Sequence, residues 1–226
     1  MFLRISHRGA VEFAPENTLT AFKKAVELGA NAIECDVHGC KSGEIMVIHD
    51  ETVDRTTNGS GLISEKTYDE LRKLNAGSRE KIPTLLEVLD IVEKSILVNI
   101  ELKNKNIIHS VCKLVNDQIN LQNYSFDKFL ISSFSSVVLR VISDFYPSIK
   151  TGLLVEHYNL DAKNEILYLQ PYAVCIDFQC VTKGIVEQVH ELGSKILVWT
   201  VNDYKDIKRM KSLNVDGIFS DYPNRL

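Results

Sequence analysis

Residues 31–37, NAIECDV, and residues 96–102, ILVNIEL, are two of nine short apolar runs that recur along the chain and decide its fold. The other seven are FLRIS (2–6), EIMVI (44–48), KFLIS (128–132), SIKTGLLV (148–155), YAVCI (172–176), KILVWTV (195–201) and VDGIF (215–219). Short apolar runs separated by longer segments are typical of buried strands in βα units. The pattern therefore predicts a parallel sheet with helices between its strands.

The segments between the runs have the spacing of amphipathic helices. Residues 17–30, NTLTAFKKAVELGA, place apolar side chains on one face between Asn17, the expected N-cap, and Gly29, the expected stop. Further helices are expected over residues 83–94, 181–193 and 202–214.

A closed (β/α)₈ TIM barrel is the simplest fold that accommodates these elements. It requires residues 44–48 to extend residues 31–37 as a hairpin, which leaves eight strands at a mean repeat near the roughly 30 residues of a βα unit. An open doubly wound sheet is the alternative, but no G-x-G-x-x-G follows the first strand. Residues 50–80 are too polar and irregular for a plain loop, so we expect a small inserted lobe after the second strand, over one barrel mouth.

Length and composition are consistent with one globular domain over residues 1–226. The chain has 45% hydrophobic and 25% charged residues, and two smaller domains are the alternative. Its formal net charge is -4, with 26 basic and 30 acidic residues spread along the chain, which argues against nucleic-acid binding. A local cluster of charges could still bind a small anion.

Cysteine usage and the apolar content of individual segments indicate the cellular setting. Five cysteines form an odd set without a C-x-x-C pair, as expected of reduced intracellular thiols. The N-terminus lacks the features of a secretory signal, and no window approaches the roughly 20 apolar residues that cross a bilayer. We expect a cytoplasmic protein with no stable membrane association.

Acidic side chains share a side on two of the predicted strands. Glu34 and Asp36 are two residues apart, as are Glu101 and Lys103, so each pair projects from one face of its strand. Surface ion pairs would explain either pair alone. Both pairs, however, end apolar strands, at the face where a TIM barrel holds its active site. Three carboxylates with one lysine there would suit a hard divalent cation.

Two histidines occupy equivalent positions at strand ends. His7 ends the first strand and precedes Arg8, and His49 follows residues 44–48. Two imidazoles at one mouth could exchange protons with a substrate, and an arginine presents a donor fork suited to phosphate. Together with the acidic cluster they indicate metal-assisted cleavage of a phosphate ester. The other four histidines are expected to be structural or solvated: His38, His109, His157 and His190.

These motifs together resemble the glycerophosphodiester phosphodiesterase family over essentially the whole chain. The most specific are H-R-G with P-E-N-T, and H-D with R-T-T-N-G. In chain order the matching segments are HRGAVEFAPENT (7–18), IECDV (33–37), IHDETVDRTTNGSG (48–61), IPTLLEVL (82–89), IELK (100–103), ISSF (131–134), GLL (152–154), VWTVN (198–202) and DGIFSDYP (216–223).

The resemblance implies a TIM barrel that hydrolyses glycerophosphodiesters to an alcohol and sn-glycerol 3-phosphate. It implies that Glu34, Asp36 and Glu101 are ligands of one divalent metal, Mg²⁺ or Ca²⁺. His7 and His49 match the acid/base pair of the family. Which histidine is the acid, and whether the nucleophile is water or the adjacent glycerol hydroxyl, is open.

Four further positions match residues of the family that contact substrate. Arg8 and Lys103 match phosphate-contacting positions, and Asn17 and Trp199 match residues near the substrate or its phosphate. A helix N-cap would also explain Asn17, and a core position would also explain Trp199. The expected ligand is a small-molecule glycerophosphodiester, bound by a monomer or homodimer.

The sequence differs from the family pattern in two places, and two other functions stay open. The final helix of the barrel is expected to be shortened or missing, and the lobe is small, which leaves little surface to select a bulky head group. A phospholipase-D-like enzyme acting on lysophospholipids or sphingolipids could use the same barrel and metal site. A non-catalytic barrel that binds a phosphorylated metabolite is the other alternative.

Overall fold

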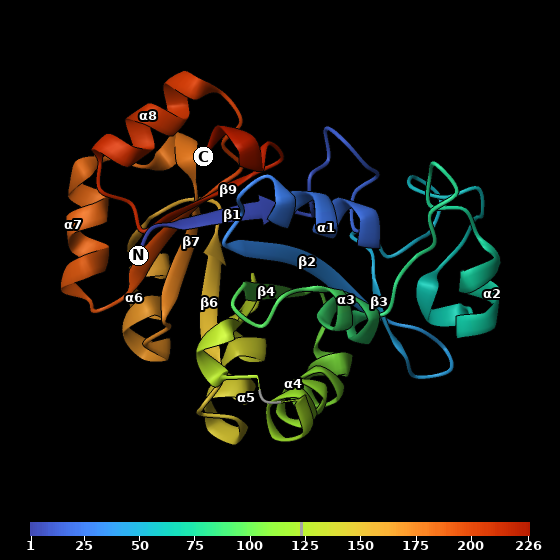
Figure 1. The fold of residues 1–226 in the computed structure, drawn as a ribbon. Helices are drawn as coiled ribbons and strands as arrows, with labels where there is room; N and C mark the ends of the chain where they lie inside the picture. Colours follow the sequence, from blue (N-terminus) through green and yellow to red (C-terminus); the bar gives the residue numbers. More distant parts are fainter. Residues whose placement is uncertain (123) are drawn as a thin grey trace.

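The computed structural model describes residues 1–122 and 124–226, and within them eight parallel strands form a closed ring (Figure 1). The ring consists of β1 (Leu3–His7), β2 (Ala32–Gly39), β4 (Leu97–Leu102), β5 (Phe129–Ser133), β6 (Lys150–Val155), β7 (Ala173–Asp177), β8 (Lys195–Trp199) and β9 (Gly217–Ser220). Strand β1 pairs with both β2 and β9, which closes the ring. The predicted TIM barrel is confirmed, and the open sheet is excluded.

The third strand, β3 (Ile45–Val47), stands outside the ring. It pairs antiparallel with the end of β2, with Val37 opposite Val47 and Gly39 opposite Ile45. The hairpin expected from residues 44–48 is therefore present, and it carries the chain past the carboxyl end of β2.

Helices connect successive ring strands and lie around the outside of the ring (Figure 1). They are α1 (Leu19–Glu27), α3 (Leu85–Ile91), α4 (Ile108–Gln122), α5 (Ser136–Phe145), α6 (Leu160–Leu169), α7 (Lys183–Glu191) and α8 (Tyr204–Ser212). After β9 the chain forms a 3₁₀ turn over Pro223–Arg225.

The start of α1 corrects one prediction. Thr18 is the N-cap, because its Oγ1 accepts a hydrogen bond from the backbone N–H of Ala21 at 3.3 Å. Asn17 was the wrong choice because its backbone is left-handed, with φ of 57°, and its side chain turns toward the barrel. Asparagine tolerates this conformation better than most residues.

Strand alternation divides the side chains of β2 and β4 between two environments. Ile33 and Cys35 of β2, like Val98 and Ile100 of β4, are fully buried in the core between the strands and the helices. The alternate positions face the barrel axis, where Ala32 and Leu97 pack with other apolar side chains in the interior. Further along the same faces, polar side chains replace apolar ones toward the carboxyl ends of the strands.

The residues predicted to form a lobe lie between β3 and α3, and Figure 1 shows them apart from the ring of helices. They include a 3₁₀ turn (Ile63–Glu65) and α2 (Tyr68–Lys73). Their buried side chains form a small core with the neighbouring hairpin: Cys40, Met46, Ile48, Val53, Ile63, Leu71, Ala76 and Ile82. Arg72 fastens α2 to α3 through two hydrogen bonds to Glu87, at 3.0 and 3.1 Å.

None of the helices over residues 1–122 and 124–226 has both the length and the apolar character needed to cross a membrane.

Candidate active site

A pocket of about 180 Å³ opens at the carboxyl ends of the ring strands. Its lining contains every predicted site residue except Asp36 and Asn17, which are buried behind it. The lining residues are His7, Arg8, Glu34, His49, Asn99, Glu101, Lys103, Phe134, Leu154, Trp199, Thr200 and Phe219. Residues from the first strand to the last thus share one mouth.

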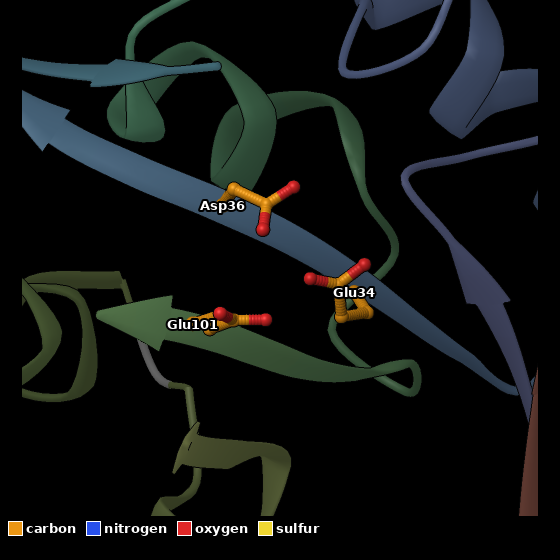
Figure 2. A group of neighbouring side chains, drawn as sticks. All are labelled: Glu34, Asp36 and Glu101. Atoms are coloured by element: carbon orange, nitrogen blue, oxygen red, sulfur yellow. The ribbon is translucent and has the colours of Figure 1, made fainter. Parts of the chain in front are cut away.

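Three carboxylates converge on one side of β2 and β4. The register pairs Asp36 with Glu101, and one oxygen from each of Glu34, Asp36 and Glu101 lies within 4.8 Å of the others. Figure 2 shows the three groups on the same side of the two neighbouring strands. Glu34 and Asp36 are 2% and 1% exposed, so water hardly screens their mutual repulsion.

The protonation behaviour of the three acids reflects this crowding. Burial raises the pKa of Glu34 well above its usual range, and the charges of Asp36 and Glu101 raise it further. Burial and Asp36 likewise raise the pKa of Glu101. Burial also opposes ionisation of Asp36, but Lys103 and Arg8 outweigh it and lower the pKa of that group. Ionisation of all three acids at once is therefore unfavourable without a further positive charge.

Two cations border the cluster. Lys103 Nζ lies 2.8 Å from Asp36 Oδ1 and also contacts Glu101. Arg8 Nε lies 3.3 Å from Asp36 Oδ2. Glu34 Oε1, by contrast, is buried and has no hydrogen-bond partner among the described residues. A free oxygen on a buried acid, next to two further carboxylates, suits a bound cation.

The turn after β1 brings Arg8 into this position. Arg8 has a left-handed backbone, with φ of 57°, and its N–H donates to Glu34 Oε2 at 2.9 Å. Gly9 follows with φ of 90°, and a Cβ at this position would lie 2.5 Å from Ala21 Cβ in α1. Glycine is required here because the turn packs directly on the helix.

His7 is held by an aspartate from the opposite end of the chain. Its Nδ1 lies 2.8 Å from Asp221 Oδ1, directly after β9. Burial raises the pKa of Asp221, but the hydrogen bond and charge of His7, the hydrogen bond from Asn202 and the charge of Arg8 together outweigh this and keep it below the ordinary value. Asp221 is therefore an ionised acceptor, so His7 Nδ1 carries the proton in the neutral ring and Nε2 is left for chemistry.

A neutral amide fixes Asp221 in turn. Asn202 Oδ1 accepts from the backbone N–H of Asp221 at 3.0 Å and from Ser220 Oγ at 3.1 Å. These two donors define the orientation of the amide, so Asn202 Nδ2 must point toward Asp221 Oδ2, at 2.7 Å.

His49 has a similar partner of different origin. Its Nδ1 lies 2.6 Å from Oδ1 of the next residue, Asp50, whose pKa the hydrogen bonds from Arg55 hold far below the ordinary value. The same argument gives His49 an Nδ1 proton and an available Nε2. His38, predicted to be structural or solvated, is buried, and its Nε2 donates to the backbone carbonyl of His49 at 3.0 Å.

Asn17 and Trp199 lie on different sides of the pocket wall. Asn17 Nδ2 donates to Asp36 Oδ2 at 2.9 Å, behind the carboxylates. Trp199 lines the pocket and meets Phe134 edge to face at 5.9 Å. It forms an apolar wall together with Leu154 and Phe219.

The sequence reasoning missed several residues that shape the site. Asn99 shares the face of Glu101 on β4, lines the pocket and is 1% exposed, so the period-two pattern could have revealed it. Asp50 could have been inferred from its position next to His49. Asn202 and Asp221 lie in two of the matching segments, but nothing in the sequence pairs Asp221 with His7, because 214 residues separate them.

Comparison with known proteins identifies the family of this chain. Residues 7–225 match the model of the glycerophosphoryl diester phosphodiesterase family. A glycerophosphodiester phosphodiesterase of Caldanaerobacter subterraneus is 39% identical, over 99% of this chain and 96% of the relative. One of Bacillus altitudinis is 37% identical, over 97% of this chain and 94% of the relative.

Solved structures show the same architecture. An Oleispira antarctica phosphodiesterase in complex with its product sn-glycerol-3-phosphate has a TM-score of 0.88 at 29% identity, covering 98% of this chain and 93% of that one. The Thermotoga maritima glycerophosphodiester phosphodiesterase has a TM-score of 0.83 at 27% identity, covering 99% and 96%. The chain therefore belongs to the glycerophosphoryl diester phosphodiesterase family, and it is an enzyme with glycerophosphodiester phosphodiesterase activity.

Proposed function

We propose that this pocket hydrolyses glycerophosphodiesters to an alcohol and sn-glycerol 3-phosphate, with His7 and His49 exchanging protons with the substrate. One observation carries the proposal: both imidazoles have Nδ1 engaged by a carboxylate and line the same pocket as two of the three clustered acids. The product complex of the Oleispira antarctica relative supports the choice of product.

Glu34, Asp36 and Glu101 are proposed to hold one divalent cation, Mg²⁺ or Ca²⁺. The fit rests on an all-oxygen donor set, which these hard cations prefer, and on the unpartnered Glu34 Oε1 described above. When bound, the cation supplies positive charge to the phosphoryl oxygens.

The side chains of the pocket divide the remaining work. Arg8 and Lys103 offset negative charge on the phosphoryl group, since both line the pocket beside the acids. One imidazole, neutral, takes a proton from the nucleophile through Nε2, and the other, as the imidazolium, gives its Nε2 proton to the leaving alkoxide. The nucleophile is either water or the glycerol hydroxyl next to the phosphate. Attack by the hydroxyl would form a cyclic phosphate, which water then hydrolyses.

A lysophospholipid substrate is the second candidate, and the apolar wall of Phe134, Leu154, Trp199 and Phe219 is the observation in its favour. The pocket volume of about 180 Å³ weighs against it, because pockets that enclose drug-sized ligands measure roughly 300–1,000 Å³. Small head groups fit the wall better than a long acyl chain.

An assay of head-group alcohol release, with glycerol phosphate measured alongside it, would test the function directly, because the second candidate would release the alcohol from a lysolipid without any glycerol phosphate. Glycerophosphocholine, other glycerophosphodiesters and a long-chain lysolipid would be compared with Mg²⁺, with Ca²⁺ and with a chelator. We expect cation-dependent release from the glycerophosphodiesters and slow turnover of the lysolipid. Faster turnover of the lysolipid would favour the second candidate, and full activity after exhaustive chelation would refute the metal role.

Thermal unfolding would test the metal ligands without an activity readout. The cation should raise the melting temperature by about 5 °C or more at roughly 100 times its dissociation constant. Glu34→Gln should abolish most of this rise, whereas Glu187→Gln, which changes an exposed acid on α7, should leave it intact. Equal rises in the two variants would contradict the assignment.

A further inference from the structure

We propose that Arg55 of the lobe is a positioning residue for His49, acting through Asp50, and that Glu16 completes the support. The proposal rests on the role of His49 in the function proposed above. It gives the lobe a part in catalysis that is separate from covering the pocket or contacting the substrate.

The guanidinium of Arg55 lies between two carboxylates and uses all three nitrogens. Nε donates to Asp50 Oδ2 at 2.7 Å, and Nη2 donates to Asp50 Oδ1 at 2.9 Å. On the other side, Nη1 and Nη2 donate to the two oxygens of Glu16, both at 2.9 Å. Two bidentate pairs on one planar group restrict both carboxylates in position and rotation.

This restraint passes directly to the imidazole. Asp50 Oδ1 accepts from His49 Nδ1 at 2.6 Å and from Arg55 Nη2 at the same time. The carboxylate can therefore neither rotate away from the ring nor offer it a proton. These hydrogen bonds keep His49 in the tautomer and ring orientation that leave Nε2 available. The backbone carbonyl of His49 accepts a further hydrogen bond from His38 Nε2.

The backbone of Arg55 is itself anchored in the lobe. Val53, two residues earlier, is fully buried in the small core of the lobe, and the N–H of Thr57 donates to the Val53 carbonyl at 3.1 Å. Asp54 Oδ2 accepts from the N–H of Gly61 at 2.9 Å. The position of Arg55 therefore depends on the folding of the lobe, whereas His49 follows the hairpin strand β3.

Glu16 links the same group to the phosphate side of the pocket. It precedes α1, is only 18% exposed, and accepts from Arg8 Nη1 at 3.1 Å as well as from Arg55. A carboxylate shared by two arginines connects the lobe to the turn after β1. Because exposed ion pairs add little to stability, we expect loss of Arg55 to affect turnover more than folding.

Arg55→Gln tests the proposal, with Arg72→Gln as the matched control. Arg72 belongs to the same lobe and also makes a bidentate pair, but with Glu87 of α3, whereas the partner of Arg55 is Asp50, which contacts His49. With glycerophosphocholine as substrate, Arg55→Gln should lower kcat by about tenfold to 100-fold and change KM less than threefold. Arg72→Gln should leave kcat within twofold and lower the melting temperature instead.

Nitrogen NMR of histidine side chains supplies a readout that a purely structural role would not move. In the ¹⁵N-labelled full-length protein, His49 should change from a single Nδ1–H tautomer to a mixture in Arg55→Gln, while His7 keeps its spectrum. Added methylguanidinium should restore part of the activity of Arg55→Ala. If the glutamine variant proves unstable, Arg55→Lys provides a second test, because it keeps the charge and loses the fork.

Three results would overturn the proposal: a kcat within twofold of wild type in Arg55→Gln, a change in KM alone, or equal spectral changes at His7 and His49. Failure of the proposed function would look different. In that case the wild-type protein itself would not release glycerol phosphate, while the tautomer of His49 would still depend on Arg55.

Discussion

The two histidines of the pocket have the same kind of partner but obtain it from different parts of the molecule. His7 on β1 pairs with Asp221 after β9, and Asn202 after β8 orients that aspartate. His49 pairs with Asp50, which Arg55 of the lobe orients. One support belongs to the ring of strands, and the other depends on an insertion into it.

The two supports also differ in charge. Asn202 is neutral and donates to one carboxylate oxygen of Asp221, whereas Arg55 is a cation that donates to both oxygens of Asp50. What the two supports share is a carboxylate that accepts from Nδ1 of the imidazole. The residue that orients this carboxylate differs: it is Asn202 at Asp221 and Arg55 at Asp50.

Removing either imidazole should have the largest effect. His7→Ala and His49→Ala should each lower kcat for glycerophosphocholine by roughly 100-fold or more, because each removes a proton-transfer group. Circular dichroism should show an intact fold. His109→Ala, which changes an exposed histidine on α4, serves as the control and should turn over normally. A nearly normal kcat in one of the two variants would mean that only the other imidazole transfers protons.

Changing each aspartate to asparagine should separate the two supports. In Asp221→Asn, Asn202 Nδ2 demands an oxygen, so the new amide NH₂ faces His7 and forces the wrong tautomer. In Asp50→Asn, the amide oxygen can take the place of Oδ1, which accepts from both His49 Nδ1 and Arg55 Nη2. The NH₂ then faces Arg55 Nε instead of the imidazole.

We therefore expect kcat to fall about 100-fold in Asp221→Asn and about tenfold in Asp50→Asn. Steady-state kinetics at saturating substrate would measure both. The reverse order would show that the amide of Asn202 does not control the orientation at position 221.

Acid should weaken the lobe support, with the smallest effect of the three. The pKa of Asp50 is lowered in the folded protein, so its pairing with Arg55 adds stability above the unfolded pKa near 4 and loses it as the pH falls below that value. Arg55→Gln should cost about 1 kcal/mol of unfolding free energy at pH 7 and less at pH 3, as urea unfolding would measure. A cost that grows in acid would contradict this sign.

The sequence was sufficient to predict the barrel and the members of the acidic cluster. Alternation on β2 and β4 directs Glu34 and Glu101 inward, and parallel strands bring their carboxyl ends to one rim. The same rule covers Asn99. The N-cap at Thr18 was missed because two adjacent residues both suit a cap, and only the left-handed backbone of Asn17 distinguishes them.

The supports of the histidines could not be predicted in the same way. Asp221 lies next to His7 because β1 pairs with β9, and Asn202 lies next to Asp221 because β9 pairs with β8. The orientation of these side chains depends on distances that no spacing rule supplies. Arg55 reaches Asp50 through an irregular turn of the lobe, whose path is set by the small core beneath it.

The pairing of the first strand with the last has a consequence for biosynthesis. A nascent chain on the ribosome acquires both imidazoles and all three acids within its first 101 residues, yet His7 gains Asp221 only when β9 joins β1. His7 therefore has no carboxylate partner until the residues of β9 and Asp221 have been made and the ring has closed.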